Sequence, residues 1–317
     1  MAEQIALAVR RGSKKVRVLE IFIDGFGLGE NDSCVNPIVA GDTPCLDTLL
    51  AGHNFWGASA VETSGALLRP LDTSLGVPGA PQSATGQTTL WTGVNGAKAA
   101  GRHVNAYPTE VLQKVIAEHS IFKTLTGLGY RATFANAFRP QFFELLAAGK
   151  RNFSTSTLTV MAAGVPLRTV DDLVAGKAVY QDITNDILIG MGLEVPRYTP
   201  GQAGRHLAAV AREHDFTLFE FFQSDKAGHK QDMECCVALV EMLDEFLAAV
   251  VDNLPREDYL VLLTSDHGNL EDLRVKGHTH NPVPALLIGD YGRTPYHRLK
   301  SIEDVAPFVL SVITGAA

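Results

Sequence analysis

Three aspartates and three histidines of this chain stand in short polar motifs that follow apolar, strand-like runs. They are Asp24, Asp225, His229, Asp266, His267 and His278. Carboxylate oxygens and imidazole nitrogens are common protein ligands of divalent cations. In open α/β sheets the ligand crevice lies outside the carboxyl ends of the strands, where groups from several strand ends converge. The pattern therefore predicts a centre for two divalent metal ions.

A candidate nucleophile lies between the first and second of these motifs, in the segment PQSATGQTT. Ser83 begins a stretch with helical character that ends at Gly93, and the free N–H groups at a helix start favour an anion. A hydroxyl becomes a good nucleophile when a base or a metal lowers its pKa, and the metal set provides that activation. The residue types leave two choices open, because Thr85 competes with Ser83 and His280 competes with His278.

Each motif taken alone has an ordinary explanation, such as a strand-to-loop turn or exposed polar residues. The pair Asp266 and His267 is the hardest to explain by packing, because burying both groups without partners is costly. The glycines of DGFGLG (24–29) do not have the G-x-G-x-x-G spacing, which disfavours a nucleotide-binding oxidoreductase.

The bulk composition is that of an ordinary globular protein, with 317 residues, 46% hydrophobic and 20% charged. A net charge of −8 argues against nucleic acid as a partner, since phosphate-backbone binding needs concentrated Lys and Arg. No window is long and apolar enough to span a membrane. The four cysteines lack zinc-finger or CxxC spacing, and 1–15 reads as a mobile leader without a secretory signal. A cytoplasmic location is therefore expected.

Strand-like runs alternate with helical periodicity, which predicts an α/β fold with a mostly parallel central sheet sandwiched by helices. Strands are expected at 16–24, 130–138, 216–225, 259–266 and 283–289. Helices are expected at 43–52, 83–93, 109–129, 202–214, 233–254 and 301–313. Residues 65–82 are rich in Gly, Pro and Ser and are expected to form an extended loop. The expected core comprises 16–99 and 201–317, with a smaller α/β cap inserted at about 100–200.

The ordered series IDGFG, PQSATGQ, SDKAGH, SDHGN and HTHNPVP resembles the metalloenzyme core of the alkaline phosphatase superfamily. Within it, the chain is similar to cofactor-independent phosphoglycerate mutases and phosphopentomutases. In that group the nucleophile stands three residues before a Gly, which selects Ser83 over Thr85. The last ligand precedes a Thr-x-Asn-Pro-Val-Pro run, which selects His278 over His280.

This resemblance implies a specific division of the ligands and a specific chemistry. One metal is expected on Asp225, His229 and His278. The other is expected on Asp24, Ser83, Asp266 and His267. The resemblance further implies Mn²⁺, Zn²⁺ or Mg²⁺ as the ion and a phosphoenzyme on Ser83.

The expected function is phosphoryl transfer on a small phosphorylated metabolite, by a phosphohydrolase or a phosphomutase. Both mutases have His after the motif Gly, where this chain has Gln87, and this difference favours hydrolysis. Arg102, His103 and Arg139 are candidate contacts for a substrate phosphate. The alternatives are a phosphodiesterase or nucleotide pyrophosphatase of the same superfamily, and a non-catalytic metal-binding protein that retains the fold.

Overall fold

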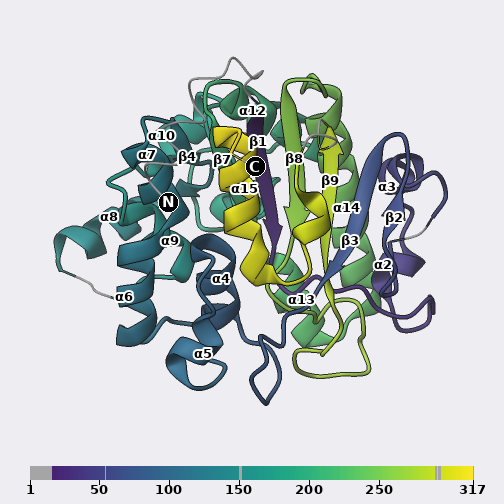
Figure 1. Ribbon diagram of the computed structural model, residues 1–317. Coiled ribbons are helices and arrows are strands. Elements are labelled where there is room, and N and C mark those ends of the chain that lie inside the picture. Colours follow the sequence, from purple (N-terminus) through teal and green to yellow (C-terminus); the bar gives the residue numbers. More distant parts are fainter. Residues whose placement is uncertain (1–15, 54, 150–151, 290, 292–293, 317) are drawn as a thin grey trace.

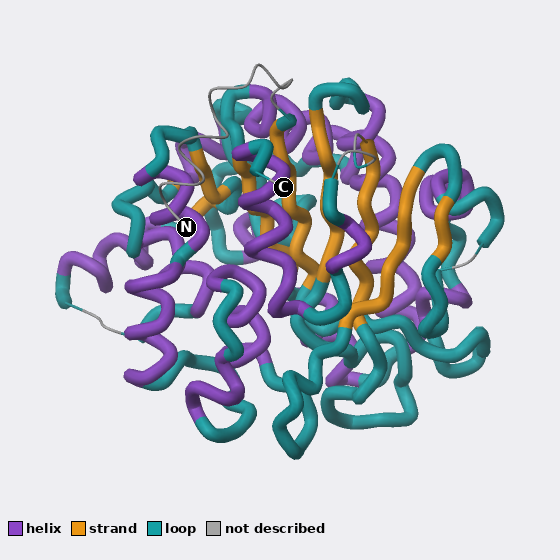
Figure 2. Tube along the Cα trace, viewed as in Figure 1, coloured by secondary structure: helices purple, strands orange, loops and turns teal. Residues whose placement is uncertain are grey.

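The central strands are apolar along their whole length because helices bury them on both faces. In a computed structural model, described for residues 16–53, 55–149, 152–289, 291 and 294–316, seven strands form one sheet in the order β2-β3-β9-β8-β1-β7-β4. The expected leader at 1–15 lies outside the described residues. Figure 2 shows the strands as one twisted layer with helices on both sides. The predicted α/β fold class is confirmed.

The centre of the sheet is parallel and one side of it is antiparallel. The parallel strands are β4 (Ala132–Phe134), β7 (Phe216–Phe221), β1 (Arg17–Ile23) and β8 (Tyr259–Thr264). The antiparallel strands are β9 (Val283–Gly289), β3 (Ala66–Leu71) and β2 (Val61–Glu62). The parallel strands end together at the lower edge of the sheet in Figure 1.

Alternate side chains of β1 enter two separate cores. Leu19 and Ile21 join the core beneath α2 (Pro37–Ala40), α3 (Pro44–Leu49), α12 (Pro200–Arg212) and α14 (Met233–Asp252). Val18 and Phe22 join the core beneath α4 (Ser83–Thr92), α7 (Ile121–Gly127) and α15 (Val305–Thr314). Burial on both faces explains why the strand reads as one apolar run rather than as an alternation.

The remaining elements have ten residues or fewer. The helices are α5 (Gly96–Ala100), α6 (Glu110–His119), α8 (Pro140–Ala147), α9 (Thr155–Met161), α10 (Val170–Val174), α11 (Asp186–Gly190), α13 (Gln223–Lys230), η1 (Tyr296–Arg298) and η2 (Ile302–Asp304). A second sheet pairs β5 (Ala137–Phe138) with β6 (Arg168–Thr169). None of the helices in the described ranges is both long and apolar enough to cross a membrane.

The extended loop expected at 65–82 is wrong in its first part, which is strand β3. Pro70 lies opposite Pro284 of β9 in the ladder. The short strand β2 pairs only with Leu67 and Leu68, so Pro70 lies where β3 has no ladder partner on its other side. A proline there removes no hydrogen bond between β3 and β2, which is why the sequence forms a strand despite its composition.

Three other expected elements are interrupted. The helix at 109–129 becomes α6 and α7, because Ser120 is extended and caps α7 by accepting from Lys123 N. The strand at 216–225 stops at Phe221, and Asp225 lies on α13. The strand at 130–138 becomes β4 and β5, because β4 pairs with β7 whereas β5 pairs with β6.

The region 100–200 is only partly separate from the core. Strand β4 pairs in parallel with β7 and forms an edge of the main sheet. The main sheet therefore includes residues of the region expected to be the cap. The following segment has a small apolar core of its own, in which Leu173, Tyr180 and Leu188 are buried. Other residues after β4, such as Val160 and Ile183, belong to the cores of the main sheet, so this segment packs only partly on itself.

Candidate metal centre

The expected ligands gather at the carboxyl ends of the parallel strands. Asp24 directly follows β1, and Asp266 and His267 follow β8. Asp225 and His229 lie four residues apart on α13, the spacing that places two side chains on one face of a helix. His278 comes from the loop before β9, and Ser83 is the first residue of α4.

One group of potential ligands is formed by Asp225, His229 and His278. His229 Nε2 lies 3.4 Å from Asp225 Oδ2, and His278 Nε2 lies 3.5 Å from Asp225 Oδ1. The other ring nitrogen of His278 lies 2.7 Å from the carbonyl oxygen of Pro81, which fixes the orientation of the ring. One ligand atom from each of the three residues lies within 4.8 Å of the others, so a single cation can contact all three.

The second group surrounds the imidazole of His267. Its Nε2 lies 3.3 Å from Asp24 Oδ1, 3.6 Å from Asp266 Oδ2 and 3.0 Å from Ser83 Oγ. Ligand atoms of Asp24, Asp225 and His267 also lie within 4.8 Å of one another. Asp225 therefore stands between the two groups, which meet in one continuous centre.

The electrostatics of this centre favour a cation. Burial and the neighbouring Asp266 raise the pKa of Asp24 well above its ordinary value. Burial and Asp225 do the same to the pKa of Asp266, whose Oδ1 has no hydrogen-bond partner among the described residues. Burial, followed by the nearby His278, lowers the pKa of His267, which keeps this ring neutral. Buried carboxylates that repel one another, beside a neutral imidazole, form a donor set that fits divalent metal ions.

Two residues missed by the sequence reasoning hold the ligands in place. Asn269 Nδ2 donates to Asp225 Oδ1 at 2.6 Å and to its backbone oxygen at 3.1 Å. The fully buried Glu271 accepts from Gly27 N at 3.0 Å and from Asn269 N at 2.8 Å, which joins the loops after β1 and β8. Their signal was present in SDHGNLE, where polar residues continue beyond the expected ligands.

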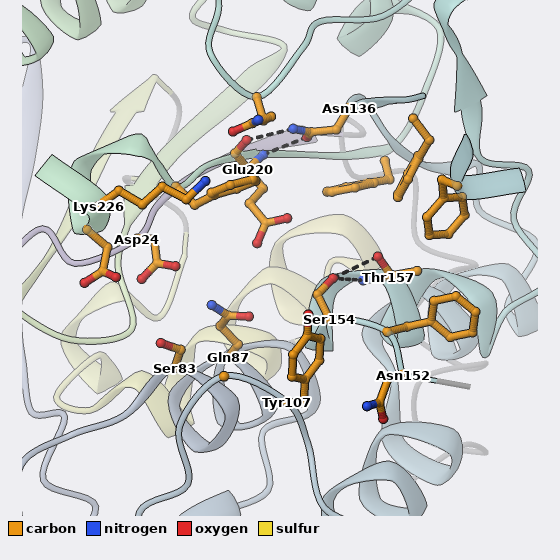
Figure 3. Close-up of a pocket in the computed structure, with 18 of the residues that line it drawn as sticks. Asp24, Ser83, Gln87, Tyr107, Asn136, Asn152, Ser154, Thr157, Glu220 and Lys226 are labelled. Carbon is orange, nitrogen blue, oxygen red and sulfur yellow. Dashed lines mark hydrogen bonds between the residues drawn. The ribbon is translucent and has the colours of Figure 1, made fainter. Parts of the chain in front are cut away.

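A pocket of about 540 Å³ opens from the metal centre. Figure 3 shows Asp24, Ser83 and Gln87 at one end of it, with Lys226 nearby. Of the candidate phosphate contacts, Arg139 lines the pocket. Arg102 and His103 are not among its described lining residues, and His103 Nε2 lies 3.2 Å from the oxygen of Val77. Polar lining residues that the sequence reasoning did not select are Asn105, Tyr107, Asn136, Asn152, Ser154, Thr157, Tyr180, Gln181, Glu220 and Lys226.

The C-terminal part of the chain is similar in sequence to known proteins. Residues 201–314, which carry all the expected ligands except Asp24 and Ser83, match the Metalloenzyme superfamily. A 2,3-bisphosphoglycerate-independent phosphoglycerate mutase of Moorella thermoacetica is 36% identical over 124 residues, or 36% of this chain and 24% of that protein. The match thus spans about a quarter of that relative's length.

Two solved structures share the fold over almost the whole chain. Alkaline phosphatase from the Antarctic bacterium TAB5 has a TM-score of 0.55 at 11% identity, over 96% of this chain and 100% of that structure. Phosphoglycerate mutase from Leishmania mexicana has a TM-score of 0.50 at 12% identity, over 96% of each chain. The fold is thus shared with alkaline phosphatase and phosphoglycerate mutase, and residues 201–314 match the Metalloenzyme superfamily in sequence. The resemblance predicted from the sequence is thereby confirmed, and the roles of individual residues stay predictions.

Proposed function

We propose that this protein transfers the phosphoryl group of a small phosphomonoester first to Ser83 and then to water. The observation that carries the proposal is the position of Ser83. Its Oγ lies 3.0 Å from His267 Nε2, at the start of a ten-residue helix, and it faces the pocket. A hydroxyl that lies beside several potential metal ligands and at a helix N-terminus is suited to attack on a phosphorus atom.

Two divalent cations, as Mn²⁺, Zn²⁺ or Mg²⁺, fit the two groups of side chains. Asp225, His229 and His278 would hold one. Asp24, Ser83, Asp266 and His267 would hold the other. When bound, such ions offset negative charge on phosphoryl oxygens and favour the ionised form of a serine hydroxyl.

The reaction proceeds in two displacements. The oxygen of Ser83 forms a bond to phosphorus while the bond from phosphorus to the substrate alcohol breaks. The hydroxyl of Ser83 gives its proton to water, and the departing alkoxide takes a proton from water, so no net acid or base is formed. A water molecule then attacks the phosphoserine, which releases inorganic phosphate and restores the hydroxyl. The helix start at Ser83 stabilises the negative charge that the phosphoryl group brings.

Release to water is favoured over return to the substrate because of Gln87. Its Nε2 donates to Asp266 Oδ2 at 3.2 Å, and its side chain lines the pocket. An amide neither gains nor loses a proton to a significant extent near neutral pH, so it cannot act as an acid or a base towards a bound alcohol. This chain therefore lacks at Gln87 the titratable group that a histidine would supply there.

The test is a substrate screen with protein loaded with Mn²⁺, Zn²⁺ or Mg²⁺. Phosphomonoesters, phosphodiesters, 3-phosphoglycerate and pentose phosphates are each offered, and both free phosphate and isomer are followed. The proposal expects phosphate from monoesters. Isomer without phosphate would establish a mutase, preference for diesters a phosphodiesterase, and metal binding without turnover a non-catalytic protein.

Substitution separates the two hydroxyl candidates. Ser83→Ala should abolish turnover and the acid-stable phosphoprotein while leaving the metal content nearly unchanged. Thr85→Ala, which removes the other hydroxyl and its bond to the Gln82 oxygen, should keep turnover. Retained turnover in Ser83→Ala would contradict the assignment.

A further inference from the structure

The end of the pocket away from the metal centre is aromatic. Phe134, Phe138, Phe142, Phe153 and Tyr180 all line it. Three successive ring pairs join the phenylalanines, with centroid distances of 5.9, 4.4 and 5.6 Å along the series from Phe134 to Phe153. The rings therefore form one continuous wall that starts at the edge of the main sheet and ends beside α8.

Helix α8 contributes to this wall instead of packing into the core. None of its eight residues is buried, although its sequence PQFFELLA is mostly apolar. An amphipathic helix ordinarily buries its apolar side. Here Phe142 turns towards Phe138 and Phe153 at the pocket, so this apolar side is available to a ligand.

Two pairs of polar residues beside the wall are bonded within the protein. The Asn136 side chain donates to the Glu220 backbone oxygen at 2.7 Å and accepts from its N–H at 2.9 Å. Figure 3 shows these two bonds and the pair formed by Ser154 and Thr157, whose oxygens lie 2.8 Å apart. A substrate rich in hydroxyls would have to displace such bonds, which makes this wall a poor match for a polyol.

We propose that the alcohol portion of the substrate carries an aromatic ring that stacks in this wall. The substrate class is then a phosphomonoester of an aromatic alcohol rather than a phosphorylated polyol or hydroxy acid. The inference rests on the proposed function, because the phosphoryl group has to sit at Ser83 for the alcohol to reach the rings. Ser83, Asp24, Phe142 and Phe153 line one pocket. A substrate whose phosphoryl group lies at Ser83 would therefore place its alcohol portion against these rings.

The test compares 2-phenylethyl phosphate with ethyl phosphate, two esters of primary alcohols with similar leaving groups. The ratio of their kcat/KM values should exceed about tenfold in favour of the aromatic ester, because the ring is buried against apolar surface. Phe142→Ala should lower this ratio by about threefold or more. Leu145→Ala is the matched control on the same helix: it is 46% exposed and is not a described lining residue, and it should leave the ratio unchanged.

Equilibrium binding separates this inference from the proposed function. Calorimetry with metal-loaded protein compares 2-phenylethylphosphonate with ethylphosphonate, neither of which can be hydrolysed. A preference of about tenfold for the aromatic phosphonate supports the inference even if no ester is turned over. Equal affinities, or a higher kcat/KM for 3-phosphoglycerate than for 2-phenylethyl phosphate, would overturn it, while phosphate release from ethyl phosphate would still support the proposed function.

Discussion

Replacing Glu20 by glutamine is expected to stabilise the fold at neutral and alkaline pH. Glu20 lies in the middle of β1 and is 0% exposed. Trp91 Nε1 donates to its Oε1 at 2.9 Å, whereas Oε2 is buried without a hydrogen-bond partner among the described residues. Burial raises the pKa of this carboxyl to about 7, against the opposing effect of the Trp91 hydrogen bond. The ionised form is therefore disfavoured in the folded state.

The size of the effect follows from the two pKa values. The ordinary pKa is 4.5 and the folded one is about 7, a span of about 2.5 pH units. Below pH 4.5 both states hold the proton and the carboxyl has no effect. As the pH rises to about 7 the unfolded chain loses the proton first, so the free energy of unfolding falls by at most about 1.4 kcal/mol per unit. Above that pH the cost is constant at about 3 kcal/mol.

Glutamine keeps an oxygen for the indole of Trp91 and removes the ionisation. Its amide N–H groups lack a partner there, which costs about 1 kcal/mol. Glu20→Gln should therefore gain about 2 kcal/mol at pH 8 and lose about 1 kcal/mol at pH 4. The removal of the pH dependence identifies the cause, because a change in packing alone would act equally at all pH values.

Urea denaturation in the presence of a chelator measures this difference between pH 4 and pH 8. The chelator removes the additional pH dependence that metal binding brings. Glu257→Gln, at an exposed glutamate, is the matched control. It should change the free energy of unfolding by no more than about 0.5 kcal/mol at either pH. A difference between Glu20→Gln and the wild type that stays constant from pH 4 to pH 8 would refute the reasoning.

Three further predictions concern the metal centre. Gly86→Ala would place a Cβ 2.8 Å from the Cβ of Asp266, so the free energy of unfolding should fall by about 1–3 kcal/mol and calorimetry should show weaker metal binding. Gly127→Ala is the control, because the space around Gly127 is open and the protein should not be destabilised. His278→Ala should reduce bound Mn²⁺ from two ions to one by atomic absorption, and two retained ions would remove it from the ligand set. Asn269→Ala removes the amide that donates to a ligand carboxylate, so metal affinity should fall about 10–100-fold, and an unchanged affinity would show that this bond does not orient the ligand.

The sequence was sufficient where a single strong cause determines the structure. Strand β9 has the predicted bounds, and β1 and β8 lie within theirs, because burial on both faces gives unbroken apolar runs. Helix α4 starts at Ser83 as predicted and ends before Gly93, which is in the left-handed region at φ 68°. The gathering of the expected ligands was predictable in the same way, since carboxylate and imidazole groups beside several strand ends have few structural explanations.

The sequence was insufficient where the surroundings decide the outcome. Strand β3 contains a proline that is tolerated only because β2 is short, a property of its neighbour. The pocket is built from segments between Asp24 and Lys226 whose composition is ordinary, so its lining has no local signature. Arg102 and His103 were selected by side-chain type alone, and type does not specify the direction in which a loop presents them.

The helix of the proposed nucleophile is fixed at both ends by groups that also determine the metal centre. At its start, Gly86 lets α4 approach the backbone and side chain of Asp266. Near its end, Trp91 bonds Glu20 and packs edge-on against Phe22, with ring centroids 5.0 Å apart. Glu20 and Phe22 belong to β1, the strand that leads directly to Asp24. The hydrogen bond from Trp91 therefore couples the position of Ser83 to that of a ligand strand. Because Glu20→Gln keeps the acceptor oxygen, stability and the geometry of the site are separable at this position.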